Sequence, residues 1–481
     1  MLFNSFKFLI FFPFVCLIYY IFRKENSKKI WLLVSSYFFY ICWNAYYSLL
    51  LIFSTLVTFL SGKLMVKYPK KKKLILIISI ILNLSTLFFF KYANFFIENI
   101  NLLLNILHLE SFNTLDILLP IGISFFTFQS TSYIIDLYRN DVKEEKNFID
   151  YALFVSFFPQ LVSGPIEKSK DFLPQLKLKH KFEYDNAKKG LLTMLVGYIY
   201  KMVIADRIAL VVNTVYGNLH EYSGIILLVV AVLYAFQIYT DFYGYSLIAK
   251  GCAKVLGYEL YDNFDSPYLS SSIKEFWRRW HISLSTWFRD YLYFPLGGSR
   301  TTKFKRLRNI IIVFLVSGLW HGASWTFIIW GLLHGIYQVI GVLTKDKRDK
   351  LCSKIHLNKH PKIEYVIRVS ITFTLVAFAW IFFRANNLND AIYYILNMFK
   401  SINLDLLSLN MDKFNLLIMF ISVFLLIIFD IIRTKVDLYE WLKRKNIIFR
   451  WIIYFVLIWI ILIFGIYGPG YSENTFIYIQ F

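Results

Sequence analysis

Long apolar runs alternate with short polar segments along this chain. A helix of about 20 residues crosses a hydrocarbon core of about 30 Å, and several of the runs approach that length. Because backbone in lipid must satisfy its own hydrogen bonds, and because the runs lack strand-like alternation, we expect them to be α-helices. The clearest runs are residues 6–22, 74–90, 224–240, 367–383, 414–432 and 451–467.

Composition supports the same class of protein. Hydrophobic residues make up 58% of the chain and aromatic residues 20%, which is more than a soluble domain usually carries. No repeat of fixed period and no low-complexity linker is visible. The sequence therefore predicts an all-α, polytopic membrane protein with about ten to twelve transmembrane or re-entrant helices around a central cavity, in a single domain over residues 1–481.

The formal net charge of +21 lies mainly in short loops between the apolar runs. This distribution follows the positive-inside rule. We therefore expect the basic loops to lie next to membrane lipid, and we expect no binding of nucleic acid. The rule places the N-terminus and segments 91–115, 216–223 and 385–413 outside, and the basic segments 23–29, 67–73, 139–146, 168–189, 274–308, 345–362 and 433–450 inside. The four cysteines form no CxxC pair and support neither a zinc site nor a disulfide framework.

Residues 239–343 differ from their surroundings and form the candidate catalytic region. Asp241 lies within an otherwise apolar run, and a charge at membrane depth is costly unless it faces protein or water. We expect Asp241 to line an interior cavity. The alternative is a helix that ends at Thr240 and leaves Asp241 in interfacial water.

Segment 274–308 is dense in Lys, Arg and Trp. Its aromatic residues recur at roughly helical spacing, which predicts an amphipathic helix in the cytoplasmic interface. Arg278, Arg279 and Arg289 either serve that membrane-surface role alone or also bind an anionic ligand, since guanidinium forks match phosphate geometry. The two roles are compatible.

Segment 309–343 carries the most information. As a continuous helix its 35 residues would span roughly 52 Å, too long for one crossing and too short for two with a loop. Basic segments flank both ends, so we expect a re-entrant hairpin that turns inside the membrane at Gly318, Gly322 and Ser324. His321 at this turn should lie in a buried polar chamber, which Trp320 should also line.

Three of the eight histidines, His281, His321 and His334, lie in this region, where an intramembrane histidine is costly without a function or a partner. His321 could deprotonate a hydroxyl near neutral pH. His281 could orient an acyl group, stabilise its oxyanion or share the proton transfer, and should share one cavity with His321. We expect His334 to be a packing residue, and no HExxH or Cys/His spacing supports a metal. Residues in loops are expected at the surface, namely His180, His220, His356 and His360.

Several stretches resemble the membrane-bound O-acyltransferase (MBOAT) family, above all its bacterial branch named for alginate O-acetylation. They include FFFKYANFF (88–96), IYTDFYGYSLIAKG (238–251), NFDSPYLSSSIKEFWRRWHISLSTWFRDYLYFPLGG (263–298), GLWHGASWTFIIWGLLHG (318–335) and the ending FIYIQF (476–481). In this resemblance the family's catalytic WHG histidine corresponds to His321, and its second histidine to His281.

The resemblance implies an O-acetyltransferase of the bacterial cytoplasmic membrane. It would take an acetyl group from cytosolic acetyl-CoA and pass it across the membrane towards an extracytoplasmic polysaccharide or peptidoglycan, with a separate SGNH-type acetyltransferase as its partner. The related D-alanyl transferases, which end on teichoic acid, fit the pattern around His321 less well. A transporter without chemistry is another alternative, but the chain lacks an inverted repeat and has paired histidines. A purely structural subunit would not require His321 at membrane depth.

The positive-inside rule makes a direct prediction for the three arginines. Single cysteines placed at Arg278, Arg279 and Arg289, in a background without the native cysteines, should react with an impermeant thiol reagent from the cytoplasmic side. Reactivity can be measured in inverted and right-side-out membrane vesicles. Labelling only from the outer side would contradict the predicted orientation.

Overall fold

The computed structural model describes residues 1–162, 164–401, 409 and 411–467. Among these residues the chain forms helices, with an isolated β-bridge between Phe264 and Trp280. The predicted all-α class is confirmed. The ending FIYIQF, one of the stretches with a family resemblance, lies outside the described residues.

The described residues group into two units by their mutual contacts. The first comprises residues 1–194 and 246–261, and the second comprises residues 195–245 and 262–467. Helices α9 (Tyr184–Tyr198) and α11 (Ile225–Val255) contribute residues to both units. The single domain expected over the whole chain stays a prediction.

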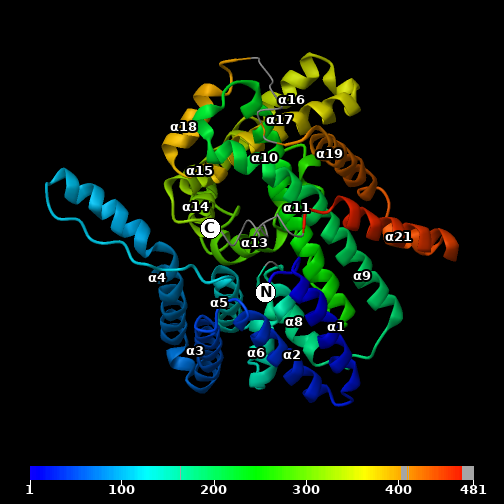
Figure 1. Ribbon diagram of the computed structural model, residues 1–481. Coiled ribbons are helices and arrows are strands. Elements are labelled where there is room, and N and C mark those ends of the chain that lie inside the picture. The colour runs from blue at the N-terminus through cyan, green and yellow to red at the C-terminus, as the bar shows by residue number, and fades with distance from the viewer. Residues whose placement is uncertain (163, 402–408, 410, 468–481) are drawn as a thin grey trace. The chain divides into compact units, whose positions relative to one another are not determined.

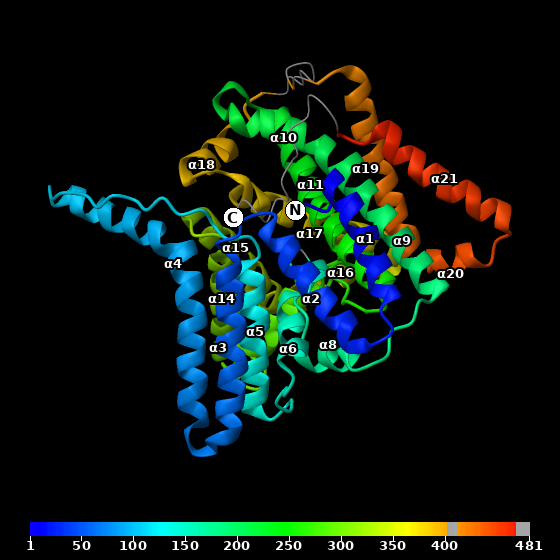
Figure 2. The same ribbon diagram turned by 60° about the horizontal axis from the view of Figure 1, so that its bottom comes forward.

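The first unit is a helical bundle in which α3, α4 and α5 lie side by side (Figures 1 and 2). Helix α5 forms the core, since nearly all of its side chains are buried. Helix α4 is 35 residues long, which corresponds to about 52 Å, so it continues well beyond the apolar run 74–90. The helices of this unit are α1 (Phe6–Ile21), α2 (Glu25–Ile41), α3 (Ser48–Lys67), α4 (Lys72–Ile106), α5 (Ile123–Arg139), α6 (Phe148–Ser156), α7 (Phe158–Leu161) and α8 (Ser169–Leu176).

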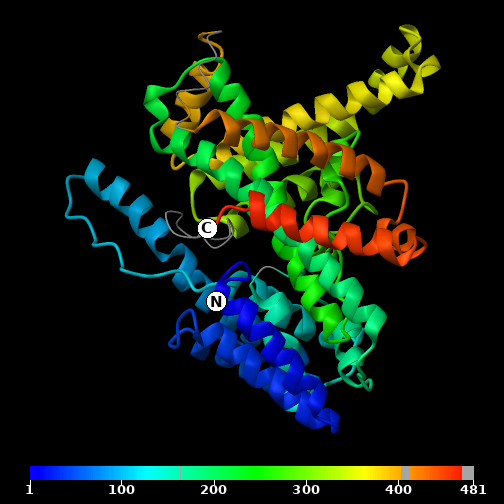
Figure 3. The same cartoon turned by 45° about the vertical axis from the view of Figure 1, so that its right-hand side comes forward.

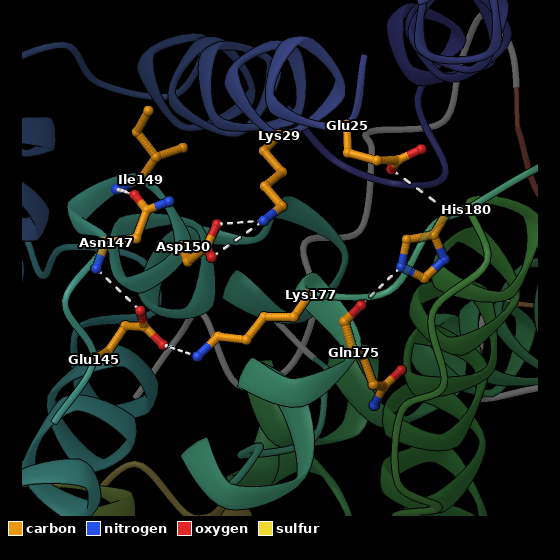
Figure 4. Close-up of polar contacts among 9 residues, drawn as sticks. All are labelled: Glu25, Lys29, Glu145, Asn147, Ile149, Asp150, Gln175, Lys177 and His180. Atoms are coloured by element: carbon orange, nitrogen blue, oxygen red, sulfur yellow. Dashed lines mark hydrogen bonds and ion pairs between the residues drawn. The ribbon is translucent and has the colours of Figure 1, made fainter. Parts of the chain in front are cut away.

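Ion pairs join α2 to α6, and the end of α8 to the loop before α6, within the first unit (Figure 4). The Lys29 ammonium lies 2.8 Å from the buried Asp150 carboxylate, and Lys177 lies 2.7 Å from Glu145. His180 is only 8% exposed, and one of its ring nitrogens lies 2.8 Å from the carbonyl oxygen of Gln175. The expectation that His180 is a surface residue was wrong, because these contacts fold its loop onto the bundle.

The second unit contains the candidate catalytic region. Helices α15 and α17 pack side by side, joined through α16 (Figure 3). A π-helical segment, Ile199–Ala205, continues α9 into α10, and a second one, Arg289–Tyr293, follows α13. The helices are α10 (Asp206–Gly217), α12 (Ile273–Arg279), α13 (Ile282–Phe288), α14 (Lys303–His321), α15 (Trp325–Leu343), α16 (Lys345–Lys354), α17 (Pro361–Arg384), α18 (Leu388–Asn397), α19 (Lys413–Arg433), α20 (Leu438–Lys443) and α21 (Ile447–Phe464).

Seven helices of the described chain are long and apolar enough to cross a membrane, namely α3, α4, α11, α15, α17, α19 and α21. Helices α4, α11, α17, α19 and α21 overlap apolar runs identified in the sequence, and α15 lies within segment 309–343. The larger number of ten to twelve crossings or re-entrant helices stays a prediction. Helix α15 alone has 19 residues, about 28 Å, so it is long enough for a crossing of its own.

Helices α14 and α15 form the predicted hairpin, and its turn is Gly322–Ser324. The Ser324 side chain caps α15 by accepting a hydrogen bond from the amide of Thr326. Gly318 is not part of the turn, contrary to expectation. It lies within α14, where a Cβ atom would come within 2.3 Å of the carbonyl oxygen of Phe327. A Cβ atom on Gly331 would come equally close, 2.3 Å, to that of Phe314. The two helices therefore approach each other backbone to backbone.

Substitution of Gly331 by alanine should separate this hairpin. The added methyl group would meet backbone atoms that cannot rotate away, so we expect a loss of about 1–3 kcal/mol, measured as a lower melting temperature of the purified protein. Gly341→Ala in the same helix is the matched control, because a Cβ there meets nothing within 4 Å. Its stability should be unchanged or higher. Equal stability of the two variants would contradict the close-packing account.

Candidate functional site

His321 is the last residue of α14 and is 3% exposed. Its imidazole packs against the rings of Trp320, Trp330 and Phe383, with centroids 4.9, 4.9 and 5.4 Å away. The position at the hairpin turn agrees with the sequence prediction. These three rings come from both helices of the hairpin and from α17. The polar chamber expected around His321 stays a prediction.

His281 lies between α12 and α13, and its backbone is left-handed, with φ 41° and ψ 57°. The single amphipathic helix expected here was wrong. Trp280 and His281 interrupt it between α12 and α13, and both side chains are fully buried. Burial lowers the pKa of His281 to about 3. The ring is therefore neutral at physiological pH and offers one N–H donor and one acceptor nitrogen.

Trp320 contacts both histidines. Its indole ring is 6.1 Å from the His281 ring and 4.9 Å from the His321 ring. These separations add to about 11 Å, so the imidazole centroids are no farther apart than that. The structure thus brings together two histidines that are 40 positions apart in the sequence. Their catalytic roles, and a cavity lined by Trp320, stay predictions.

His334 supports the site by packing, as its position in the sequence suggested. It is fully buried, and its Nδ1 atom accepts a hydrogen bond of 3.2 Å from the indole N–H of Trp277. Trp277 belongs to α12, which leads to His281, whereas His334 belongs to α15, which packs on the helix that carries His321. This hydrogen bond therefore connects the elements that bear the two histidines.

Asp241 lies in a buried ion cluster. Helix α11 continues to Val255, so the alternative of a helix ending at Thr240 was wrong. The Lys201 ammonium is 2.6 Å from Asp241 and 2.8 Å from Asp206, and all three side chains are almost fully buried. Sequence reasoning missed Lys201 and Asp206. Lys201 lies between apolar residues, which is the signal that identified Asp241, whereas Asp206 is followed directly by Arg207.

The three arginines differ in their surroundings. The Arg278 side chain is 77% exposed, and its nearest ion partner, Glu275, is 3.9 Å away. Arg279 forms a closer pair of 2.7 Å with the same carboxylate, and Arg289 pairs at 2.7 Å with Asp290. Arg278 is therefore the most accessible of the three for an anionic ligand. Within the described part of the chain, no group of three or more His, Cys, Asp or Glu side chains is placed to hold a metal ion.

Comparison with known proteins decides the family. The sequence pattern of the membrane-bound O-acyltransferase family matches residues 39–385. The chain belongs to the membrane-bound O-acyltransferase family. It is thus a multi-pass membrane protein and an O-acyltransferase, and the buried histidines lie within the matched residues.

Several bacterial members of the family are similar to this chain. The probable alginate O-acetylase AlgI of Pseudomonas aeruginosa is 38% identical over 395 residues, which cover 81% of this chain and 73% of the relative. The peptidoglycan O-acetyltransferase of Helicobacter pylori is 39% identical over 404 residues, covering 78% and 74%. The teichoic acid D-alanyltransferase of Streptococcus thermophilus is more distant, at 31% over 291 residues, covering 56% and 69%.

The ion cluster around Lys201 yields a stability prediction for this O-acyltransferase. Lys201→Met removes an ammonium from between two buried carboxylates, and breaking such a buried pair destabilises proteins by about 3–5 kcal/mol. Lys188→Met is the matched control, because its partner Asp185 is 61% exposed. Ion pairs with a partner at the protein surface contribute about 0–1 kcal/mol. Thermal unfolding in detergent measures both, and equal melting temperatures would show that Lys201 does not stabilise the fold.

Proposed function

We propose that this chain transfers acetyl groups from cytosolic acetyl-CoA across the bacterial cytoplasmic membrane for O-acetylation of an extracytoplasmic polysaccharide or peptidoglycan. The observation that carries the proposal is the buried pair His281 and His321, both of which contact the ring of Trp320. Acetylation of a glycan is suggested by the names of the two more similar relatives, whereas the D-alanyl transferase matches a smaller part of the chain.

In this proposal His321 is the general base. Its imidazole takes the proton of an acceptor hydroxyl, the hydroxyl oxygen attacks the thioester carbonyl, and a C–O bond forms. The tetrahedral intermediate then expels the coenzyme A sulfur as the C–S bond breaks, and the proton on His321 passes to that sulfur. Aromatic side chains around His321 would keep water from competing with the acceptor.

His281 would stabilise the oxyanion of the intermediate. A neutral imidazole can donate one N–H to that oxygen, and a donor fixed in a buried site is worth more than one in water. On the donor side, Arg278 would contribute most to binding the phosphates of coenzyme A, because Arg279 and Arg289 already face carboxylates. We further propose that an SGNH-type acetyltransferase receives the acetyl group outside the membrane.

His321→Ala should abolish acetylation while the protein still folds and inserts. Loss of a general base lowers a rate typically by about 10²–10⁴-fold. The measurements are the ester-linked acetate content of the cell's glycans and the hydrolysis of acetyl-CoA by purified protein, which also distinguishes an enzyme from a transporter. His220→Ala, an exposed histidine, is the matched control and should retain activity. A normal acetate content in a strain that expresses His321→Ala at the native level would contradict the role of His321 as the general base.

A further inference from the structure

The loop of residues 263–265 is hydrogen-bonded to the backbone on both sides of His281. Before the histidine, the Arg279 carbonyl oxygen accepts a hydrogen bond of 3.0 Å from the amide of Asp265, and Trp280 forms a β-bridge with Phe264. After it, the amide of Ile282 donates a 3.0 Å hydrogen bond to the carbonyl oxygen of Asn263. Loop 263–265 therefore runs antiparallel to residues 279–282, and His281 is the residue that bulges out of the pairing.

The bulge requires His281 to adopt a conformation that side chains other than glycine rarely take. Its φ of 41° is left-handed, and such a backbone persists only where the surroundings over-determine it. Bulges next to active sites re-aim a side chain in this way. Here the imidazole packs against Phe242, 4.6 Å away, and against Trp320, whose ring also contacts His321.

The Asn263 side chain also binds the first turn of α13. Its Oδ1 atom accepts a hydrogen bond of 2.7 Å from the Ser283 hydroxyl and one of 3.3 Å from the Ser283 amide. Asn263 is 1% exposed and Ser283 6% exposed, so water does not compete with these bonds. Asn263 thus binds both residues that follow His281. Its backbone carbonyl binds Ile282, and its side chain binds Ser283.

The loop itself is anchored, which allows it to act as a rigid support. Phe264 packs on Phe242 and Tyr243 of α11, at centroid separations of 5.0 and 5.5 Å, and on Trp280 at 5.0 Å. Ser266 accepts a hydrogen bond of 3.1 Å from the Arg433 guanidinium of α19. The position of Asn263 is therefore set by packing that does not involve His281.

We propose that Asn263 is a positioning residue for acyl transfer, which holds His281 in its left-handed bulge and so keeps its imidazole directed towards the acyl group. This inference rests on the proposed function, because it assumes that His281 acts in the reaction. Asn263 does not touch the substrate. Its loss should therefore slow the chemical step and leave binding of the donor unchanged.

The test compares four variants of the full-length protein, Asn263→Ala, Ser283→Ala, the double variant and His281→Ala, with acetyl-CoA as the probe. Initial rates of acetyl-CoA hydrolysis give kcat and KM, and melting temperatures report stability. Asn397→Ala is the matched control, because Asn397 is a buried asparagine of α18 whose side chain bonds only locally, to the Tyr393 carbonyl oxygen, among the contacts described.

We expect Asn263→Ala to lower kcat about tenfold or more and to change KM by less than about twofold. Ser283→Ala should lower kcat by a smaller factor, since the Ser283 amide still reaches Asn263. The double variant should be no slower than Asn263→Ala, because both changes remove hydrogen bonds between the same two residues. Asn397→Ala should retain kcat at a comparable melting temperature.

Three results would overturn the inference. The first is a kcat within about twofold of that of the unmodified protein in folded Asn263→Ala. The second is an increase in KM in place of a fall in kcat for the same variant. The third is an equal loss of kcat in Asn397→Ala. Should Asn263→Ala not accumulate as folded protein, an unchanged kcat in Ser283→Ala would overturn it. Full activity of His281→Ala would instead reject the role of His281 in the proposed function, whereas an inactive His281→Ala beside a normal Asn263→Ala rejects only the positioning role.

Discussion

The close backbone contact between α14 and α15 is the constraint on which the site depends. With glycine at 318 and 331, the two helices approach until a single methyl group would clash with a carbonyl oxygen. That approach makes a tight turn possible at Gly322–Ser324, and the turn places His321 at the end of a helix and not within one. The aromatic side chains of α15 and α17 then close around the imidazole.

The second histidine reaches the same place by a different means. His281 is held by a loop that contacts α11 and α19. The His281 ring contacts Trp320, which also contacts His321. Two independently supported elements thus converge on one indole ring. The hydrogen bond from Trp277 to His334 also joins these two elements.

Much of this arrangement could be predicted from the sequence. Apolar runs identify the long helices, and the length of segment 309–343, together with its glycines, predicts the hairpin that carries His321. The break at His281 could not be predicted, because the aromatic residues on both sides keep a helical period while the bulge depends on pairing with Asn263, far along the chain. The burial of His180 also depends on partners far along the chain, Lys28 and Tyr258, which no local pattern contains.

The central claim is that one buried site receives an acetyl group on the cytoplasmic side and delivers it outside. Inverted membrane vesicles, which expose the cytoplasmic face, can be supplied with acetyl-labelled acetyl-CoA, which does not cross the bilayer. The account predicts that vesicles containing this chain accumulate label in their lumen as alkali-labile glycan ester, and that right-side-out vesicles do not. Absence of luminal ester, or equal labelling in both orientations, would contradict it.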